Sequence, residues 1–139
     1  MSTAVFYIDS AARGSVNGRP NHSEWQDTGI TLNQNQAYDV TCQGKATPIY
    51  HYPNTGAFIA GPEGGGNSLP DFLAPNLQAL AAIAKIGKDG TPFFIGKGYD
   101  ENSTLISRNS GSESGKLFLA YNDSLANDNM GGFFANIHY

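Results

Sequence analysis

The chain has 139 residues, a length that predicts a single domain spanning residues 1–139 with an apolar core of its own. Only 14% of the residues are charged, the formal net charge is -4, and the eight Lys and Arg residues are scattered singly. A nucleic-acid-binding surface needs a basic stripe that neutralises phosphates, so this composition excludes nucleic acid as an expected partner.

Short segments rich in alternating, β-branched or aromatic residues recur along the chain, with turn signals between them. Spacing of this kind predicts an all-β fold, an antiparallel sandwich or barrel. In chain order, the expected strands are residues 4–9, 28–32, 37–42, 79–86, 92–95, 104–107, 116–121 and 132–139.

The segment ALAAIAKI at 79–86 is also compatible with a helix, because Ala and Leu favour one. We expect a strand, since Pro75 precedes the segment, a glycine turn follows it and the segments around it are β. The last two expected strands, 116–121 and 132–139, look like neighbours joined by the polar connection NDSLANDN.

The N-terminal stretch and the hydropathy of the chain predict its location. The stretch MSTAVFYIDSAARG has no basic region, and Asp9 interrupts it before a signal-like apolar segment is long enough. The longest apolar run, residues 77–86, is too short and too polar to cross a bilayer. We expect a cytoplasmic protein without membrane insertion, whose release or surface association would need a route without a signal peptide.

Cys42 is the only cysteine, which excludes an internal disulfide and a zinc cluster of thiolates. It alternates with Tyr38 and Val40 on the apolar face of an expected strand, so we predict a buried, inert thiol. The three histidines lack metal-ligand spacing; they are His22, His51 and His138.

Residues 43–76 are rich in glycine and proline and predict a long irregular connection. Long connections without regular structure in a compact domain are usually functional. We therefore expect part of the functional site to come from this stretch.

The connection NDSLANDN, residues 122–129, contains five Asn or Asp residues among eight. It does not fit an EF-hand, because Phe134 stands twelfth from Asp123, where a bidentate Glu is needed. The connection does concentrate oxygen donors, with Asp123, Asp128 and Asn129 as candidate calcium ligands and a backbone carbonyl between them. Turn geometry alone also favours Asn, Asp and Gly. The pattern leaves both interpretations open.

The sequence YND at 121–123, followed by DN at 128–129 and then G-x-F-x-x-NI, resembles the C-terminal motif of the galactophilic calcium lectins of the bacterial PA-IL type. Residues 27–45, GPEG at 61–64 and AKIG at 84–87 agree with the same family in order. The resemblance implies a small antiparallel β-sandwich with jelly-roll character, one bound Ca²⁺ ion and no catalytic step. It also implies that the ion takes two neighbouring hydroxyls of galactose.

By position, the resemblance implies that the side chains of Asp123, Asp128 and Asn129 bind the calcium ion. It adds the backbone carbonyl of Leu125, three residues before the DN pair. Another carbonyl comes from the loop after the early strand pair, where the first candidate is Tyr50 and the alternatives are Pro48 and Ile49.

Two further oxygen positions on the ion remain for the sugar. Asp123 and Asp128 can also accept hydrogen bonds from the bound hydroxyls, which would fix the choice of diol. The family adds a His and a Gln after GP-x-G, but the matching stretch here, GGNSLPDF, has neither. The candidates for additional sugar contacts are Asn67, Ser68 and Asp71.

One monosaccharide supplies about 4 to 6 kcal/mol of binding free energy, so useful avidity needs several sites on one assembly. The family forms tetramers, and we expect a homo-oligomer that binds galactose-containing glycans. The final apolar strand, residues 132–139, either pairs across a subunit interface or lies inside the monomer's own sandwich.

Two other functions compete with a galactose-binding lectin. The first is a small glycoside hydrolase, whose acid and base would come from carboxyl groups such as those of Glu63, Asp71 and Asp100. The second is a calcium-stabilised, non-catalytic module with another sugar specificity. We favour the lectin, because 139 residues leave little chain for a catalytic cleft beside a calcium loop.

Overall fold

The computed structural model describes residues 1–48, 59–127 and 129–139. Within these ranges the chain forms ten β-strands and no helix, so the predicted all-β fold is confirmed. The strands are β1 (Thr3–Asp9), β2 (Arg13–Val16), β3 (Arg19–Ser23), β4 (Gln26–Leu32), β5 (Ala37–Pro48), β6 (Ala82–Ile86), β7 (Phe93–Phe94), β8 (Arg108–Asn109), β9 (Gly115–Tyr121) and β10 (Asn129–His138).

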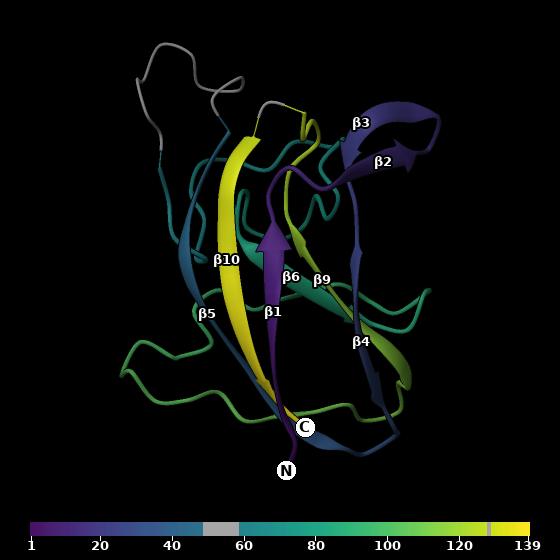
Figure 1. Ribbon diagram of the computed structural model, residues 1–139, viewed down its shortest axis with the longest axis vertical. Coiled ribbons are helices and arrows are strands. Elements are labelled where there is room, and N and C mark those ends of the chain that lie inside the picture. The colour runs from purple at the N-terminus through teal and green to yellow at the C-terminus, as the bar shows by residue number, and fades with distance from the viewer. Residues whose placement is uncertain (49–58, 128) are drawn as a thin grey trace.

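Two four-stranded antiparallel sheets form a small β-sandwich (Figure 1). The first sheet has the strand order β1-β10-β5-β8 and the second has the order β4-β9-β6-β7. A separate two-stranded sheet, β2-β3, lies at the end of the sandwich that is opposite the two chain termini (Figure 1).

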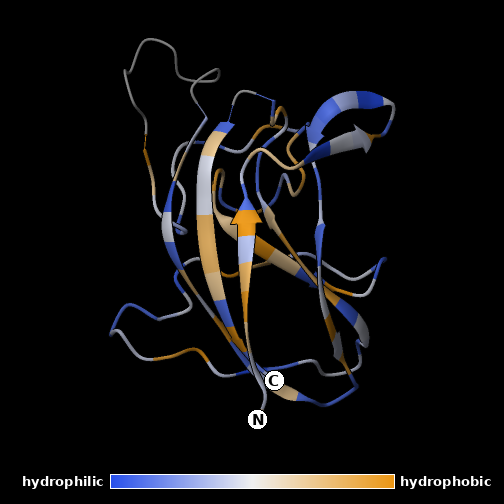
Figure 2. Cartoon of the chain, in the orientation of Figure 1, coloured by the Kyte–Doolittle hydropathy of each residue, from blue (hydrophilic) through white to orange (hydrophobic). Residues whose placement is uncertain are grey.

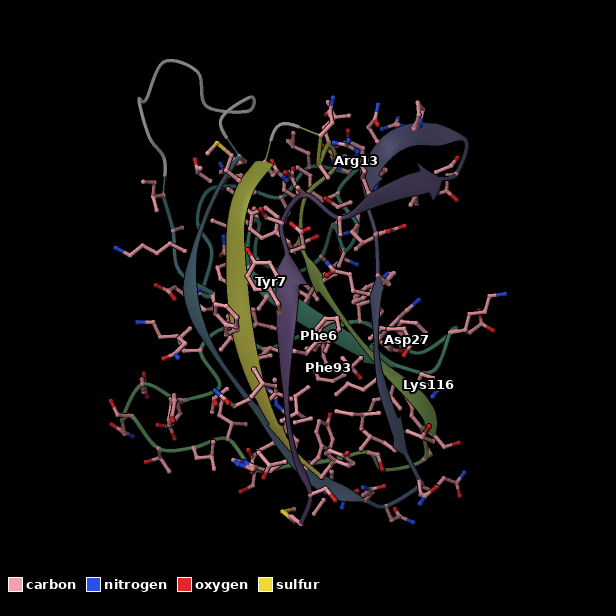
Figure 3. The ribbon with its side chains drawn as sticks, in the orientation of Figure 1. Phe6, Tyr7, Arg13, Asp27, Phe93 and Lys116 are labelled. Atoms are coloured by element: carbon pink, nitrogen blue, oxygen red, sulfur yellow. The ribbon has the colours of Figure 1, made fainter. Side chains whose placement is uncertain are left out.

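The core lies between the two sheets and follows the period-two alternation of the strands. In β10 the side chains of Phe133, Ala135 and Ile137 are fully buried, while Phe134 between them is exposed. In β9 Leu117 and Leu119 point into the same core. Phe6 and Phe93, labelled in Figure 3, pack against this core from the two sheets. Burial of these alternating apolar side chains is the main term that holds the sheets together.

The outer face of the second sheet is also covered. Ile83 of β6 and Ala120 of β9 point away from the main core, yet both are fully buried. Trp25, Leu73 and Leu77 pack over them. The irregular segment 70–78 is therefore fixed against the sheet, which holds it close to the end of β9.

The predicted strands at 116–121 and 132–139 exist, but the prediction that they are neighbours is wrong. Strand β9 pairs with β4 and β6 in the second sheet, whereas β10 pairs with β1 and β5 in the first. The connection NDSLANDN is thus a crossing between the sheets and not a hairpin turn. Strand β10 has partners along both edges, so its edges cannot pair across a subunit interface.

Other expectations need smaller corrections. Residues 79–81 precede the strand expected at 79–86, which begins at Ala82. Residues 104–107 form no strand; Leu105 makes only an isolated bridge with Tyr99. The hairpin β2-β3 was not expected, because its alternation is weak and its residues are polar.

The turn of this hairpin is an Asn-Gly pair. Asn17 and Gly18 have φ values of 51° and 78°, both positive. Asn-Gly is the preferred pair for a two-residue hairpin turn that needs φ above zero at both positions. The turn residues therefore account for the hairpin where the apolar pattern does not.

Candidate functional site

A set of buried polar residues gathers where the β9–β10 connection meets the hairpin. We call Ser10, His22, Ser23, Asn122, Asp123, Ser124 and Asn129 the polar cluster; all are buried. The connection and the hairpin lie at the same end of the sandwich in Figure 1. Buried polar groups cost free energy unless they are hydrogen-bonded, so the partners of each one decide what this end can do.

Asp123 and Asn129 stand at the centre of the polar cluster. The Asp123 side chain is 0% exposed and Asn129 is 5% exposed. Asp123 Oδ1 accepts a hydrogen bond of 2.7 Å from the Ser124 backbone N–H, and Oδ2 accepts one of 2.8 Å from Asn129 Nδ2. The structure therefore brings together two of the predicted calcium ligands, which come from the end of β9 and the start of β10.

The orientation of the Asn129 carboxamide is fixed by its amino group. Nδ2 donates to Asp123 Oδ2 and, at 2.9 Å, to the backbone carbonyl of Ser10. Both partners are acceptors, so only the amino group can face them. The carbonyl oxygen Oδ1 must then point elsewhere, and it is buried without a hydrogen-bond donor among the described residues. A buried oxygen of this kind costs about 1 to 3 kcal/mol unless a water or a cation satisfies it.

Asn122 anchors the neighbouring segment 70–78 to the end of β9. Its Nδ2 donates to the carbonyls of Ala74, Leu77 and Gln78 at 2.9, 3.3 and 3.0 Å, and its Oδ1 accepts from the Ala74 N–H at 2.9 Å. Leu73 N–H also donates to the Asp123 carbonyl at 3.0 Å. The YND sequence thus combines a structural amide with the carboxylate of the candidate site.

The carbonyl of Leu125 is placed by pairing with β3. Leu125 and His22 form an antiparallel bridge, flanked by bonds from Ser23 N–H to the Ser124 carbonyl and from Ala126 N–H to the Asn21 carbonyl. Leu125 and His22 thus form a non-hydrogen-bonded pair, in which the carbonyl of each residue points away from the partner strand. The Leu125 carbonyl therefore accepts no backbone hydrogen bond from β3.

His22 is not arranged as a metal ligand. Its Nδ1 lies 2.7 Å from the Ser23 carbonyl oxygen and its Nε2 lies 2.7 Å from the Asp71 carbonyl oxygen. Both ring nitrogens thus face acceptors. The ring links β3 to the segment that follows Pro70, in agreement with the absence of ligand spacing around the histidines.

The two predicted sugar contacts differ in position. The Ser68 hydroxyl donates to the Leu77 carbonyl, which also accepts from Asn122, so Ser68 serves the same anchor. Asp71 is partly exposed and pairs with Arg19 of the hairpin at 3.1 Å. Ser68 is therefore engaged with the backbone, while the Asp71 side chain faces the hairpin.

Two predicted ligands, Tyr50 and Asp128, lie outside the described residues, as does the alternative Ile49. The other alternative carbonyl, Pro48, is the last residue of β5 and is the register partner of Asn129 in β10. Pairing of the two sheet strands therefore brings the end of β5 beside the polar cluster.

The carboxylates considered for a hydrolase each have a different partner. Glu63 Oε1 lies 3.9 Å from Lys97 Nζ, and the Asp71 carboxylate pairs with the Arg19 guanidinium. Asp100 Oδ1 accepts hydrogen bonds from the backbone N–H groups of Asn102 and Thr104 at 2.9 and 3.0 Å, which stabilises its own turn.

Within the part of the chain that the structure describes, no three His, Cys, Asp or Glu side chains cluster as metal ligands. The donors that do gather at the polar cluster are a carboxylate, a carboxamide oxygen and backbone carbonyls. Oxygen donors of these types suit calcium, whereas zinc favours imidazole and thiolate ligands. The residues present therefore fit a hard cation.

Sequence reasoning missed the supporting residues Ser10 and Leu73. Ser10 accepts from Asn129 across 119 sequence positions, and its hydroxyl donates to the Gly131 carbonyl at 2.6 Å. Ser10 orients Asn129 through its backbone carbonyl and Leu73 contacts Asp123 through its backbone N–H, and such backbone groups leave no signal in the identity of their residues. Only the role of Asn122 was open to inference, because it belongs to YND.

No protein-family model and no curated protein matches this chain. Within the described residues, no helix is long and apolar enough to cross a membrane.

Proposed function

We propose that the protein is a calcium-dependent lectin that binds terminal galactose of glycans through a calcium ion held at the polar cluster. The single observation that carries this proposal is the Asn129 Oδ1 atom, which is buried beside the fully buried Asp123 carboxylate and has no donor among the residues that the structure describes. The resemblance of YND and DN-x-G-x-F-x-x-NI to the galactophilic calcium lectins supports it independently.

The proposed ligands are oxygens from three parts of the fold. Asp123 and Asn129 supply side-chain oxygens, Leu125 supplies its carbonyl and Asp128 supplies a second carboxylate. The fifth oxygen comes from the end of β5 or the residues after it, where Tyr50 remains the first candidate. Calcium takes about 6 to 8 oxygens, so such a set leaves room for two more.

The two remaining positions suit a vicinal diol. A sugar with two suitably oriented hydroxyls replaces two waters by equivalent oxygens on one rigid molecule. The carboxylates of Asp123 and Asp128 balance the two positive charges of the ion, which favours a neutral ligand. They also accept hydrogen bonds from the hydroxyls and thereby select the diol.

The position of Asp71 supports it as a further sugar contact more strongly than that of Ser68. Its side chain is partly exposed, and its segment joins the candidate site through the bond from Leu73 N–H to the Asp123 carbonyl. The Ser68 hydroxyl already donates to the Leu77 carbonyl. We therefore propose that Ser68 supports the segment and that Asp71 contacts sugar.

We also propose that the protein works as a homo-oligomer, as the weak binding of one sugar requires. The outer face of the first sheet carries Val5, Tyr7 and Phe134 in exposed positions, and the Tyr7 and Phe134 rings lie 5.0 Å apart. Tyr7 lies on this face in Figure 3. A second copy of the chain on this face would cover these side chains; sedimentation of the parent and of Phe134→Ser measures whether it does.

A glycan array probed in calcium and again in a chelator tests the proposal. The lectin predicts calcium-dependent binding to galactose-terminated glycans. Binding to mannose or fucose without a response to galactose would retain a calcium lectin and overturn the galactose preference. Release of reducing sugar from oligosaccharides would favour the hydrolase.

The ligand assignment has its own control. Asp128→Ala should abolish sugar binding and leave a folded sandwich, whereas Cys42→Ser should leave binding intact. Sugar binding by Asp128→Ala equal to that of the parent would show that the ligand pair is wrongly assigned.

A further inference from the structure

A hollow lies between the hairpin β2-β3 and the segment after Pro70. Its volume is about 420 Å³, within the range of roughly 300 to 1,000 Å³ typical of small-molecule sites. Val16, Asn17 and Arg19 line it from the hairpin, and Pro70 and Asp71 line it from the facing segment. We call this space the hairpin hollow.

Both walls of the hairpin hollow are fixed. The hairpin wall is closed by the pairs Arg13↔Ser23 and Val16↔Arg19 and by the Asn17-Gly18 turn with both φ values positive. The facing wall is held to it twice through Asp71, by the side-chain contact with Arg19 at 3.1 Å and by its carbonyl near His22 Nε2 at 2.7 Å. A ligand entering here would meet pre-organised groups and cause little loss of conformational entropy.

The hairpin hollow and the candidate calcium site share structural members. His22 lines the hollow and pairs with Leu125, whose carbonyl is a proposed calcium ligand. Leu73 also lines the hollow, and its N–H donates to the carbonyl of Asp123 at 3.0 Å. The hollow, whose residues come from 16–22 and 70–73, therefore shares backbone neighbours with the candidate calcium site through His22 and Leu73.

The lining has the chemistry of a carbohydrate subsite. Val16 and Pro70 provide apolar contact for the C–H groups of a ring. A guanidinium has five N–H donors, and the Arg19 contact with Asp71 uses one of them. The Asn17 amide can both donate and accept hydrogen bonds, and the Asp71 carboxylate can accept them. In Figure 2 the hairpin is coloured blue and pale, without the orange stretches that β6 and β10 carry.

The charge of the lining indicates a neutral occupant. Arg19 and Asp71 balance one another, so the hollow presents a dipole of neighbouring donors and acceptors without a net charge from this pair. Hydroxyl groups both donate and accept hydrogen bonds, so they match such a pair on both sides. An anionic group near this pair would be attracted by Arg19 and repelled by Asp71, so the pair offers it little net attraction.

We propose that the hairpin hollow is a second subsite that holds the next neutral sugar unit of a glycan whose terminal sugar is bound at the calcium ion. This proposal rests on the proposed function and extends its ligand from a monosaccharide to a di- or trisaccharide. The hairpin is then a specificity element, because it forms one wall of the subsite and contributes the guanidinium.

Calorimetric titration of the calcium-loaded protein with methyl galactoside and with a linkage panel of galactose-terminated di- and trisaccharides tests the subsite. In the parent, at least one extended sugar should bind about fivefold or more tightly than methyl galactoside. Arg19→Ala should remove most of that difference while the affinity for methyl galactoside stays within about twofold; hydrogen bonds to charged groups are worth changes of this size.

Arg13→Ala is the matched control, because Arg13 is also an exposed cation of the hairpin but does not line the hollow. It should leave both affinities unchanged. Equal affinities for methyl galactoside and every extended sugar in the parent would overturn the subsite, as would an Arg19→Ala loss shared equally by all sugars or matched by Arg13→Ala. A parent that binds no sugar with calcium would overturn the proposed function and, with it, this extension.

Discussion

The interior of the sandwich and the polar cluster at its β9–β10 end are both shielded from water, but they are stabilised by different means. In the interior, Phe133, Leu119 and Ile137 are fully buried and need no directional partner. In the polar cluster, Asp123 and Asn129 are as well buried, and each depends on bonds of fixed geometry.

The difference teaches what the polar cluster costs and what it provides. Apolar burial contributes about 25 cal/mol per Å² and tolerates small shifts of the side chains. A buried carboxylate and carboxamide gain little net stability, because their hydrogen bonds replace bonds to water. The polar cluster therefore adds little to the free energy of unfolding, and what it provides is oxygen atoms of fixed orientation. The following predictions separate these two contributions.

The largest expected effect is in the interior. Phe133→Ala should lower the free energy of unfolding by about 3 to 5 kcal/mol, because it removes a fully buried ring and leaves a cavity. Urea denaturation in calcium and in a chelator should give the same loss. The control is Phe134→Ala, which is 51% exposed in the single chain and should cost less than about 1 kcal/mol at a dilution at which sedimentation shows one copy. A larger loss at concentrations at which the chain associates would agree with the proposed interface on that face.

Asn122→Ala should come next, with a loss of about 2 to 4 kcal/mol, because it leaves the buried N–H of Ala74 and several carbonyls of segment 74–78 without their side-chain partner. Unlike Phe133→Ala, it should also weaken calcium binding, since Asn122 adjoins Asp123. Equilibrium denaturation and calcium titration of the same sample measure both. A variant that loses stability but keeps the parent's calcium affinity would separate the anchor from the site.

Calcium at 100 times its dissociation constant should stabilise the parent by about 2.7 kcal/mol, or roughly 10 °C in melting temperature. Asn129→Ala should abolish the shift, because it removes the oriented Oδ1 atom. The control is Asn127→Ala, an exposed residue of the same connection, which should keep the shift. Loss of the calcium-induced shift in both variants would mean that the shift depends on the conformation of the connection and not on the Asn129 Oδ1 atom.

The smallest effect concerns the interior at alkaline pH. Burial raises the pKa of the Cys42 thiol from 9.0 to about 12. The unfolded chain therefore loses this proton first, and the stability it contributes is complete below pH 9.0 and is lost as the pH rises towards 12. At pH 10 the loss should be about 1 kcal/mol. The pH dependence of urea denaturation should be weaker by this amount in Cys42→Ala. An identical dependence in the two proteins would contradict a buried thiol.

The apolar strands were predictable from sequence because alternation records which side chains face the core. The segments KLFLAY and GFFANIHY became β9 and β10 for this reason. Alternation does not record which sheet a strand joins, so the crossing made by residues 122–129 was predicted as a connection between neighbours. The pairing of β10 with β1 and β5 depends on segments about a hundred residues away.

The candidate site was predictable only in its side chains. Asp123 and Asn129 stood out by residue type, and in the structure Asn129 Nδ2 lies 2.8 Å from Asp123 Oδ2. The other parts of the site depend on contacts that the sequence does not record. The Ser10 carbonyl, which orients Asn129, is brought there by a tertiary contact, and the hairpin beside the site depends on turn geometry. The Asn17-Gly18 pair was a usable signal for the hairpin, but the weak alternation of β2 and β3 concealed it.

The most direct test of the central claim is a calorimetric titration of galactose into the parent, first loaded with calcium, then treated with chelator, then reloaded. The calcium-loaded protein should release heat with sub-millimolar affinity, the chelated protein should release none and reloading should restore the signal. Galactose binding of equal strength in the chelated protein, or no binding in any state, would contradict a calcium ion at Asp123 and Asn129 that captures the sugar.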